Sequence, residues 1–334
     1  MKRAKNIVRE ETIQPLLRRC ARPIALSLFA FIATTVFVLV ACSAPQNQSA
    51  PSNTGLQAAT TDWKEVAQAL GKEGSVQPGD VYKVSLPRSD LKVTINGVEL
   101  KPALALGSWV AFKKTGDMTV AMGDLVLTED EVTPVLTKLQ EGGIEQTALH
   151  NHVLHESPRV MYMHIHGMGD AVKIAKAIHD ALALSKTPFT ASASTAQVQD
   201  LGIDTKQLDQ IMGQSGKVNG GVYQFAVARA DKIMENGLEV PPSMGLATAI
   251  NFQPTGGGKA AITGDYVLIA SEVNPVIRAL RDNGIEVTAL HSHMLEETPR
   301  LFFMHFWANE DAQKLARGLR AALDKMNIVK AQAK

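Results

Sequence analysis

One stretch of the chain occurs twice, and this duplication constrains the fold more than any other feature. Gly143–Leu182 aligns with Gly284–Leu323 without a gap, and 20 of the 40 paired positions are identical. The offset is a constant 141 residues, so we expect both copies to adopt the same local structure. The repeated polar and turn residues are His150, His152, Glu156, Pro158, Arg159 and His164, which match His291, His293, Glu297, Pro299, Arg300 and His305.

Each copy is predicted to form an antiparallel hairpin. The segments TALHNHVL and VMYMHIHG are rich in apolar and β-branched residues, and the turn-forming HESPR separates them. Histidines at i and i+2 share one face of a strand. With a loop at His155–Arg159, His150 faces His164 and His152 faces Tyr162, and facing side chains lie about 4.5–5.5 Å apart. Three imidazoles then converge, unless a one-residue slip turns His164 to the other face.

Three imidazoles with a nearby carboxylate are typical ligands of a transition metal such as Zn²⁺. The predicted ligands are His150, His152, Glu156 and His164 in the first copy, and His291, His293, Glu297 and His305 in the second. The spacing also resembles that of cupins, but the flanking glycines of that motif do not fit. The alternative is that these histidines are hydrogen-bonded sheet residues that fix an interface, because duplication copies structural residues equally well.

The N-terminal segment is predicted to direct export. Residues 2–22 hold seven Lys or Arg, the uncharged run Ile24–Val40 follows, and Leu39–Cys42 has the form of a bacterial lipobox. Residues 1–41 are therefore predicted to be a lipoprotein signal peptide, with lipid on Cys42 anchoring an exported protein to a membrane of the bacterial cell envelope. An uncleaved membrane helix is the alternative, since about 17 apolar residues approach the length of a span.

Composition narrows the possible functions. Residues 42–61 are rich in Ser, Ala, Pro, Asn and Gln and predict a flexible tether. The only other cysteine is Cys20, so the mature domain has no thiolate ligand, cysteine nucleophile or disulfide. Outside residues 1–23 the chain has 27 basic and 31 acidic residues, and this balance gives nucleic-acid binding no electrostatic basis. There is no phosphate-binding loop or nucleophile elbow, so no nucleotide cofactor is expected.

The remaining elements predict an α+β fold of two homologous repeats, residues 62–184 and 201–330, joined by a linker at 185–200. Asp62 and Asp204 are expected to cap short helices, and Thr128 with Glu131 suggests a capping box. Asn-Gly pairs indicate tight hairpins in both copies. Each repeat is predicted to be an antiparallel sheet with helices packed on one side, partly in the ferredoxin-like order βαββα, and the repeats are expected to be related by a pseudo-twofold axis.

A Gly-Asp pair precedes each predicted hairpin, at Gly123-Asp124 and Gly264-Asp265. A glycine within a strand suggests a bulge or a close backbone approach. The aspartates are interpreted as turn residues, and the alternative is that they orient metal-bound histidines from a second shell.

The blocks MGDLVLTEDEV through MYMHIHG and TGDYVLIASEV through GLRAAL resemble the LppY/LpqO family of bacterial lipoproteins. The resemblance covers both repeats and rests on TALHxH, the following E-x-P-R and a later Met-His. It implies export, lipidation and duplication, but no activity, because the family is a domain of unknown function. The copies also differ: His155 and His166 correspond to Glu296 and Trp307, so two sites would not be equivalent.

Two functions remain open from the sequence. The first is metal binding. A metal-dependent hydrolase is its more specific form, with Glu156 or Glu297 as a ligand or general base. The second is a non-enzymatic envelope protein that binds a small molecule, cell-wall fragment or protein partner, with structural or pH-sensitive histidines. Whether the two hairpins face each other or line separate clefts is left open.

Overall fold

The same sheet forms in both halves of the computed structural model, with central strands that are buried along most of their length. The structure describes residues 63–190 and 200–329, so the predicted signal peptide, the tether, Cys42 and Asp62 lie outside the described residues. The helices and strands of the first repeat are α1 (Lys64–Leu70), β1 (Ser75–Gln77), β2 (Val81–Pro87), β3 (Thr94–Ile95), β4 (Val98–Glu99), α2 (Pro102–Ala105), β5 (Gly107–Thr115), β6 (Met118–Thr128), α3 (Glu129–Glu141), β7 (Glu145–His150), β8 (Glu156–Ser157), β9 (Val160–Gly169) and α4 (Ala171–Leu182).

The second repeat follows the same order. Its elements are α5 (Thr205–Met212), β10 (Lys217–Asn219), β11 (Val222–Ala228), β12 (Met234–Glu235), β13 (Leu238–Glu239), the 3₁₀ helix η1 (Pro242–Met244), β14 (Ala247–Gly256), β15 (Lys259–Ile269), α6 (Ala270–Asp282), β16 (Glu286–His291), β17 (Glu297–Thr298), β18 (Leu301–Asp311) and α7 (Ala312–Leu323).

Each repeat folds into a six-stranded antiparallel sheet, as the sequence predicts. The strand orders are β1-β2-β5-β6-β9-β7 and β10-β11-β14-β15-β18-β16, and they correspond strand by strand. The order β6-β9-β7 agrees with the ferredoxin-like part of the prediction. The short hairpins β3-β4 and β12-β13 pair with β8 and β17 of their own repeats.

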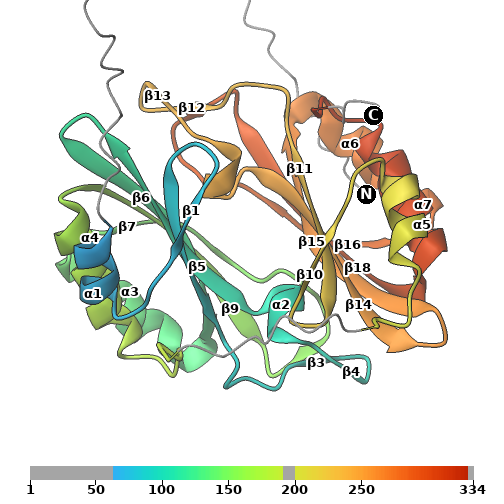
Figure 1. Cartoon of the computed structure of the whole chain (residues 1–334), viewed down its shortest axis with the longest axis horizontal. Helices are drawn as coiled ribbons and strands as arrows, with labels where there is room; N and C mark the ends of the chain where they lie inside the picture. Colours follow the sequence, from blue (N-terminus) through green and yellow to red (C-terminus); the bar gives the residue numbers. More distant parts are fainter. Residues whose placement is uncertain (1–62, 191–199, 330–334) are drawn as a thin grey trace, which may run out of the picture. The chain divides into compact units, whose positions relative to one another are not determined.

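Helices cover the outer face of each sheet, and the two inner faces meet (Figure 1). Two apolar clusters lie between helices and sheet, one in each repeat. Two further clusters join the repeats: one packs Val81 and Val120 against Phe303, and the other packs Val126 and Tyr162 against Trp307. All described residues therefore belong to one compact unit in which the inter-repeat interface is itself core.

Local signals in the sequence explain how several elements begin and turn. Asp204 caps α5 by accepting from Gln207 N, and Glu131 completes the predicted capping box by accepting from Thr128 N. The Asn96-Gly97 turn has positive φ at both residues, as the predicted hairpin requires. Glu131 also binds the fully buried Arg88 at 2.7 Å, and Glu272 holds Arg229 in the same way.

Candidate metal centre

The six predicted histidines come from equivalent places in the two repeats. His150 and His291 end β7 and β16, and His164 and His305 lie within β9 and β18. The remaining pair, His152 and His293, lies two residues beyond the ends of β7 and β16. The two hairpins face each other, so the question left open by the sequence is answered in favour of one shared cluster.

The register within each hairpin differs from the prediction. His150 pairs with Tyr162, whereas His164 pairs with Ala148, and His152 lies outside the ladder. A bulge between Gln146 and Ala148 accompanies this pairing, and β16 has the same irregularity. The predicted pairing of His150 with His164 is thus wrong by two residues. A shift of two keeps each side chain on its original face, so the three imidazoles still converge.

The rings stack in pairs across the repeats, and the pairs follow a twofold relationship. His150 stacks on its own counterpart His291, with ring centroids 3.6 Å apart. His152 stacks on His305 at 3.7 Å, and the equivalent pair His293 and His164 stacks at 3.6 Å. The offset of 141 exchanges the last two pairs and maps the first onto itself. The histidine cluster is therefore built on the pseudo-twofold axis.

Neighbouring groups hold the outer rings in place. His152 lies between His305 and Tyr162, whose ring centroid is 3.3 Å away, and His293 lies between His164 and Phe303 at 3.6 Å. The hydroxyl of Thr288 donates to the carbonyl oxygen of His152 at 2.6 Å, across the two repeats.

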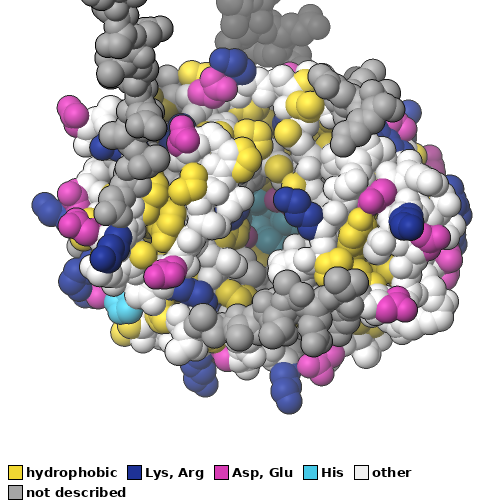
Figure 2. Space-filling view, in the orientation of Figure 1, with side chains coloured by type: hydrophobic (Ala, Val, Ile, Leu, Met, Phe, Trp, Pro, Cys, Tyr) yellow, Lys and Arg dark blue, Asp and Glu magenta, His cyan; other side chains and the backbone are white. Residues whose placement is uncertain are grey.

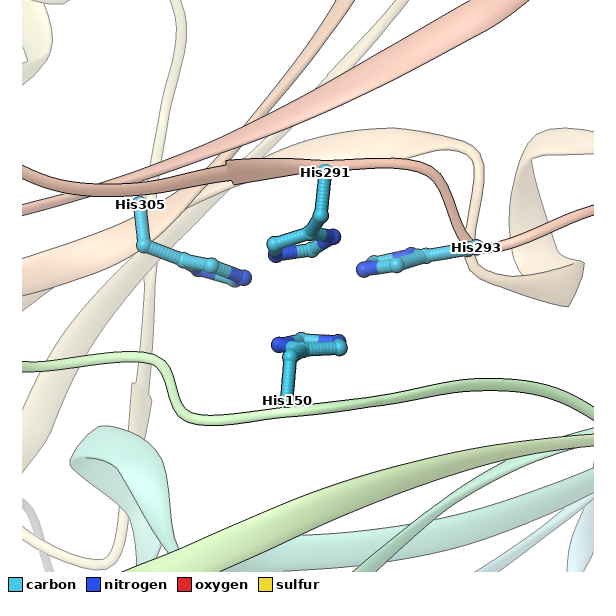
Figure 3. A group of neighbouring side chains, drawn as sticks. All are labelled: His150, His291, His293 and His305. Carbon is cyan, nitrogen blue, oxygen red and sulfur yellow. The ribbon is translucent and has the colours of Figure 1, made fainter.

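The ring nitrogens form two groups that can hold a metal. All six histidines have a buried Nε2 atom without a hydrogen-bond partner. Ligand atoms lie within 4.8 Å of one another in one group of His150, His152 and His164, and in a second of His150, His291, His293 and His305. The side chains of the second group point toward a common centre (Figure 3). Buried polar atoms are normally paired, so six unpaired nitrogens in one place require an explanation.

A hydrogen bond determines the tautomer of the His305 ring. The Nδ1 of His305 lies 2.8 Å from the carbonyl oxygen of Gly264, which only accepts, so Nδ1–H donates. In the neutral ring Nε2 then carries a free lone pair directed into the cluster. Metal-binding histidines characteristically donate their other ring N–H in this way.

The cluster favours neutral imidazoles. Burial lowers the pKa of His150 to about 4 and that of His305 to about 3. Burial, followed by the nearby His305 and His150, lowers the pKa of His291 to about 2. The pKa values of His152, His164 and His293 are also well below the ordinary value, mainly because of burial. The rings are thus unprotonated at neutral pH, which is the form that binds metals.

Two aspartates join the site. Asp124 and Asp265 lie within β6 and β15, not in turns, so their interpretation as turn residues is wrong. Asp124 Oδ1 lies 3.8 Å from His164 Nε2, and Asp265 Oδ2 lies 3.9 Å from His293 Nε2. Burial raises the pKa of Asp124 to about 7, opposed by the charge of Lys83. Burial, reinforced by the charge of Asp124, raises the pKa of Asp265 well above its ordinary value.

The glycines before these aspartates show why the strands approach so closely. A Cβ atom on Gly123 would lie 2.9 Å from the Trp109 carbonyl oxygen, and one on Gly264 would lie 1.9 Å from that of Ala249. The predicted close backbone approach is confirmed at both positions. The Gly-Asp pair within a strand was the available signal for this part of the site.

The structure does not bring the two predicted glutamates into the nitrogen groups. Glu156 and Glu297 lie in β8 and β17, and neither belongs to the groups found among the described residues. Burial raises the pKa of Glu156 to about 7. Glu297 accepts from Leu301 N at 2.9 Å and pairs with Arg300 at 3.2 Å. His166, which only the first copy has, is buried and lies 3.4 Å from Glu145.

Histidine side chains are visible on one face of the molecule (Figure 2). Figure 2 shows histidine side chains at the bottom of a hollow with hydrophobic side chains around it. A small cavity next to the cluster is lined by His164 and His293 together with Trp109, Met122 and Phe303, among others.

Comparison with protein families accounts for the duplication. The model described as "Domain of Unknown Function (DUF1259)" matches the chain twice, over residues 64–184 and 206–325. The chain belongs to this family. The two matches correspond to the two sheets and confirm a duplicated domain of unknown function.

Comparison with solved structures gives only weak likenesses. The trimeric bacterial microcompartment shell protein PduB is 12% identical with a TM-score of 0.22, over 78% of this chain and 97% of that chain. EtuB from Clostridium kluyveri is 8% identical with a TM-score of 0.19, over 76% and 90%. The ethanolamine utilization protein EutL from Leptotrichia buccalis is 7% identical with a TM-score of 0.17, over 76% and 95%. Scores this low support no argument about function.

No significant match was found among curated proteins. Within residues 63–190 and 200–329, no helix is long and apolar enough to cross a membrane.

Proposed function

We propose that this protein binds a transition metal through its histidine cluster. The observation that supports the proposal best is the buried, unpaired Nε2 atom on each of the six histidines. A buried polar atom without a partner costs about 1–3 kcal/mol. Six such atoms in one cluster are costly for an apo protein, whereas a metal ion would convert each unpaired nitrogen into a ligand.

The donor set indicates which metals suit the site. Neutral imidazole binds Zn, Cu, Fe and Ni, whereas Mg²⁺ and Ca²⁺ prefer oxygen. The lowered histidine pKa values favour the unprotonated donors at neutral pH. Zn²⁺ is our first choice because it commonly takes three histidines and leaves a position open.

Metal content tests this proposal directly. The full-length chain should be purified without a metal-affinity tag, dialysed against trace-metal buffer and analysed for bound elements. We expect a transition metal in the wild type and a large loss in the His150→Gln/His291→Gln variant. His155→Asn is a suitable control, because His155 is exposed and outside the cluster. Metal-free wild type that shows no thermal shift with Zn²⁺, Cu²⁺, Ni²⁺ or Fe²⁺ would overturn the proposal.

The finer proposal is a metal-dependent hydrolase. A Zn²⁺ ion held by three histidines lowers the pKa of its bound water to about 7 and supplies hydroxide at neutral pH. The hollow in Figure 2 supports access of a small substrate to the cluster. Asp124 is the carboxylate nearest to His164 and would hold or accept a proton there. Hydrolysis of ester and phosphoester model substrates by the metal-loaded protein, lost with the His150→Gln/His291→Gln variant, is the expected result.

The competing proposal is a non-enzymatic envelope binding protein with structural histidines. The close ring stacking across the repeats supports it, because stacked rings alone can join two sheets. The metal analysis separates the two proposals. A stable metal-free wild type, together with destabilised histidine variants, would favour the structural role.

We also propose that the chain is an exported lipoprotein of the LppY/LpqO type, anchored through Cys42. The support is the basic and apolar N-terminal sequence that leads to Leu39–Cys42. Mass spectrometry of the mature protein from a bacterial host should find an acylated N-terminal Cys42. A Cys42→Ser variant should keep the uncleaved, unacylated N-terminus, and an unmodified Cys42 in the wild type would contradict the proposal.

A further inference from the structure

We propose that the histidine cluster is a two-metal centre that holds one ion for each repeat and assigns one aspartate to each ion. This inference rests on the metal-binding function proposed above and adds the number, placement and counter-charge of the ions.

The histidine rings stack between the repeats, whereas their ligand nitrogens group within each repeat. Rings stack between the repeats, as His152 does with His305 and His164 does with His293. Ligand nitrogens instead gather within each repeat. One group is the three histidines of the first repeat, and the other is the three of the second with His150 added. Each repeat therefore presents its own set of three nitrogens.

A single ion cannot use all six rings. Ligand nitrogens bound at about 2.0–2.1 Å to one ion lie at most about 4.2 Å apart. Neither group found among the described residues contains all six histidines, even with a wider limit of 4.8 Å. His150 is the one member that both groups share. Its unpartnered Nε2 can bind only one ion, and its partner across the axis is His291.

Symmetry also favours a pair of ions. An ion on the pseudo-twofold axis needs a ligand group that the axis maps onto itself, and neither nitrogen group has this property. The space between the faces of His150 and His291 is excluded as well, because their ring centroids are only 3.6 Å apart. Any ion bound by one triad is therefore off the axis, and the duplication supplies an equivalent position for a second ion.

Two buried carboxyl groups are available to balance two cations. Six neutral imidazoles provide no negative charge, but Asp124 and Asp265 provide two carboxylates inside the same site. The Oδ1 atoms of both aspartates are buried without a hydrogen-bond partner. Asp124 Oδ1 is 3.8 Å from His164 Nε2, and Asp265 Oδ2 is 3.9 Å from His293 Nε2. These separations are too long for hydrogen bonds but fit two ligands of one ion.

Stoichiometry is the first test. The full-length protein should be stripped of metal with chelator, loaded with Zn²⁺ alone, dialysed and analysed for zinc per chain. We expect two equivalents in the wild type. One equivalent would overturn the two-metal centre while leaving metal binding intact. No bound zinc, together with no thermal shift on adding Cu²⁺, Ni²⁺ or Fe²⁺, would overturn both proposals.

Half-site variants test whether the ions belong to separate triads. The matched pair is His152→Gln/His164→Gln and His293→Gln/His305→Gln, and each variant should retain about one equivalent. Loss of all zinc, or retention of two equivalents, in a folded variant would contradict one triad per ion. Asp124→Asn and Asp265→Asn should each weaken one equivalent by about tenfold or more. Unchanged affinity in both would remove the aspartates from the proposal.

A spectroscopic test on the wild type avoids variants that fail to fold. Cu²⁺ is added to metal-free protein, and its electron paramagnetic resonance signal is followed at one and two equivalents. Two neighbouring ions should broaden or weaken the signal when the second equivalent binds. Two sharp, additive signals would locate the second ion away from the cluster and overturn the proposal.

Discussion

The middle of the interface between the repeats is symmetric, whereas its two ends are not. In the middle, three pairs of histidines stack at 3.6–3.7 Å and every partner has an identical counterpart. At one end, His166 and Glu235 line the same pocket. At the other end the equivalent residues are Trp307 and Ile95, which belong to one apolar cluster.

The residues at equivalent positions show how the two ends of the interface differ. Ile95 and Glu235 are equivalent because they pair with Glu156 and Glu297 in the small sheets. One end therefore has a polar pair, and the other has an apolar pair. A residue at an end contacts only its local partners, so a second change nearby can compensate. A histidine near the axis stacks on a histidine of the other repeat, so one substitution disturbs both repeats.

The largest difference is expected between the two glycines that precede Asp124 and Asp265. Gly264→Ala would bring its Cβ within 1.9 Å of the Ala249 carbonyl oxygen, whereas Gly123→Ala would leave 2.9 Å to that of Trp109. We expect Gly264→Ala to lower the free energy of unfolding by more than about 4 kcal/mol, and Gly123→Ala by about 1–3 kcal/mol. Urea unfolding of both variants measures this. Equal losses of unfolding free energy would mean that the backbone around Gly264 is less tightly packed than the structure indicates.

The apolar end should be more sensitive to truncation than the polar end. Trp307 is buried in the inter-repeat cluster, so Trp307→Ala should cost about 3–5 kcal/mol. His166→Ala removes a smaller side chain beside Glu145 and should cost less. Denaturant midpoints give both values, and metal content of the folded variants serves as the control. A larger loss for His166→Ala would reverse the assignment of the two ends.

Acid should weaken the middle of the interface in the metal-free protein. A histidine whose folded pKa lies below its unfolded value of about 6.5 binds fewer protons when folded, so stability falls as the pH drops below that value. For His150 the fall continues down to its folded pKa of about 4. The expected slope is about 1.4 kcal/mol per pH unit for each such histidine.

Thermal unfolding of the metal-free protein between pH 7 and pH 4 tests this expectation. The His150→Gln/His291→Gln variant should show a shallower dependence, and bound Zn²⁺ should delay the loss by holding the rings unprotonated. The comparison with the variant is needed because the raised pKa values of Asp124, Asp265 and Glu156 change stability in the opposite direction over this range. Identical pH dependence in the wild type and the variant would contradict the lowered pKa values of His150 and His291.

The smallest effect is expected from exchanging the polar end for the apolar pair. His166→Trp and Glu235→Ile should each be destabilising alone, because each leaves one member of the original pair. The double variant recreates the combination of Trp307 and Ile95 and should recover part of the loss. A double-mutant cycle should give a coupling of about 1 kcal/mol. Strict additivity would show that the two residues diverged independently.

Local chemistry made much of the fold predictable. Alternation identified some strands and continuous apolar runs identified others, and Asp204 and Thr128 marked helix starts that the structure confirms. The repeated HxH with a later histidine identified the six side chains of the cluster. These signals act over a few residues, and they hold wherever the segment lies in the fold.

The exact geometry of the site was less predictable, because it depends on distant parts of the chain. His150 pairs with Tyr162, two residues from the predicted partner, and nothing in the hairpin sequence marks this register. Asp124 reaches the histidines through pairing of β6 with β9, so its role required the sheet order. Glu156 looked like a ligand from its spacing, but its strand pairs with β3 outside the nitrogen groups.

The stacking of His150 on His291 determines how the site would respond to dilution of the protein. The site is made where two equivalent domains meet, as in a symmetric dimer, yet both domains are on one polypeptide. Two separate chains would lose the site below their dissociation constant. Covalent linkage replaces that constant with an effective local concentration, on the order of millimolar for short linkers. The histidine cluster can therefore form independently of the protein concentration.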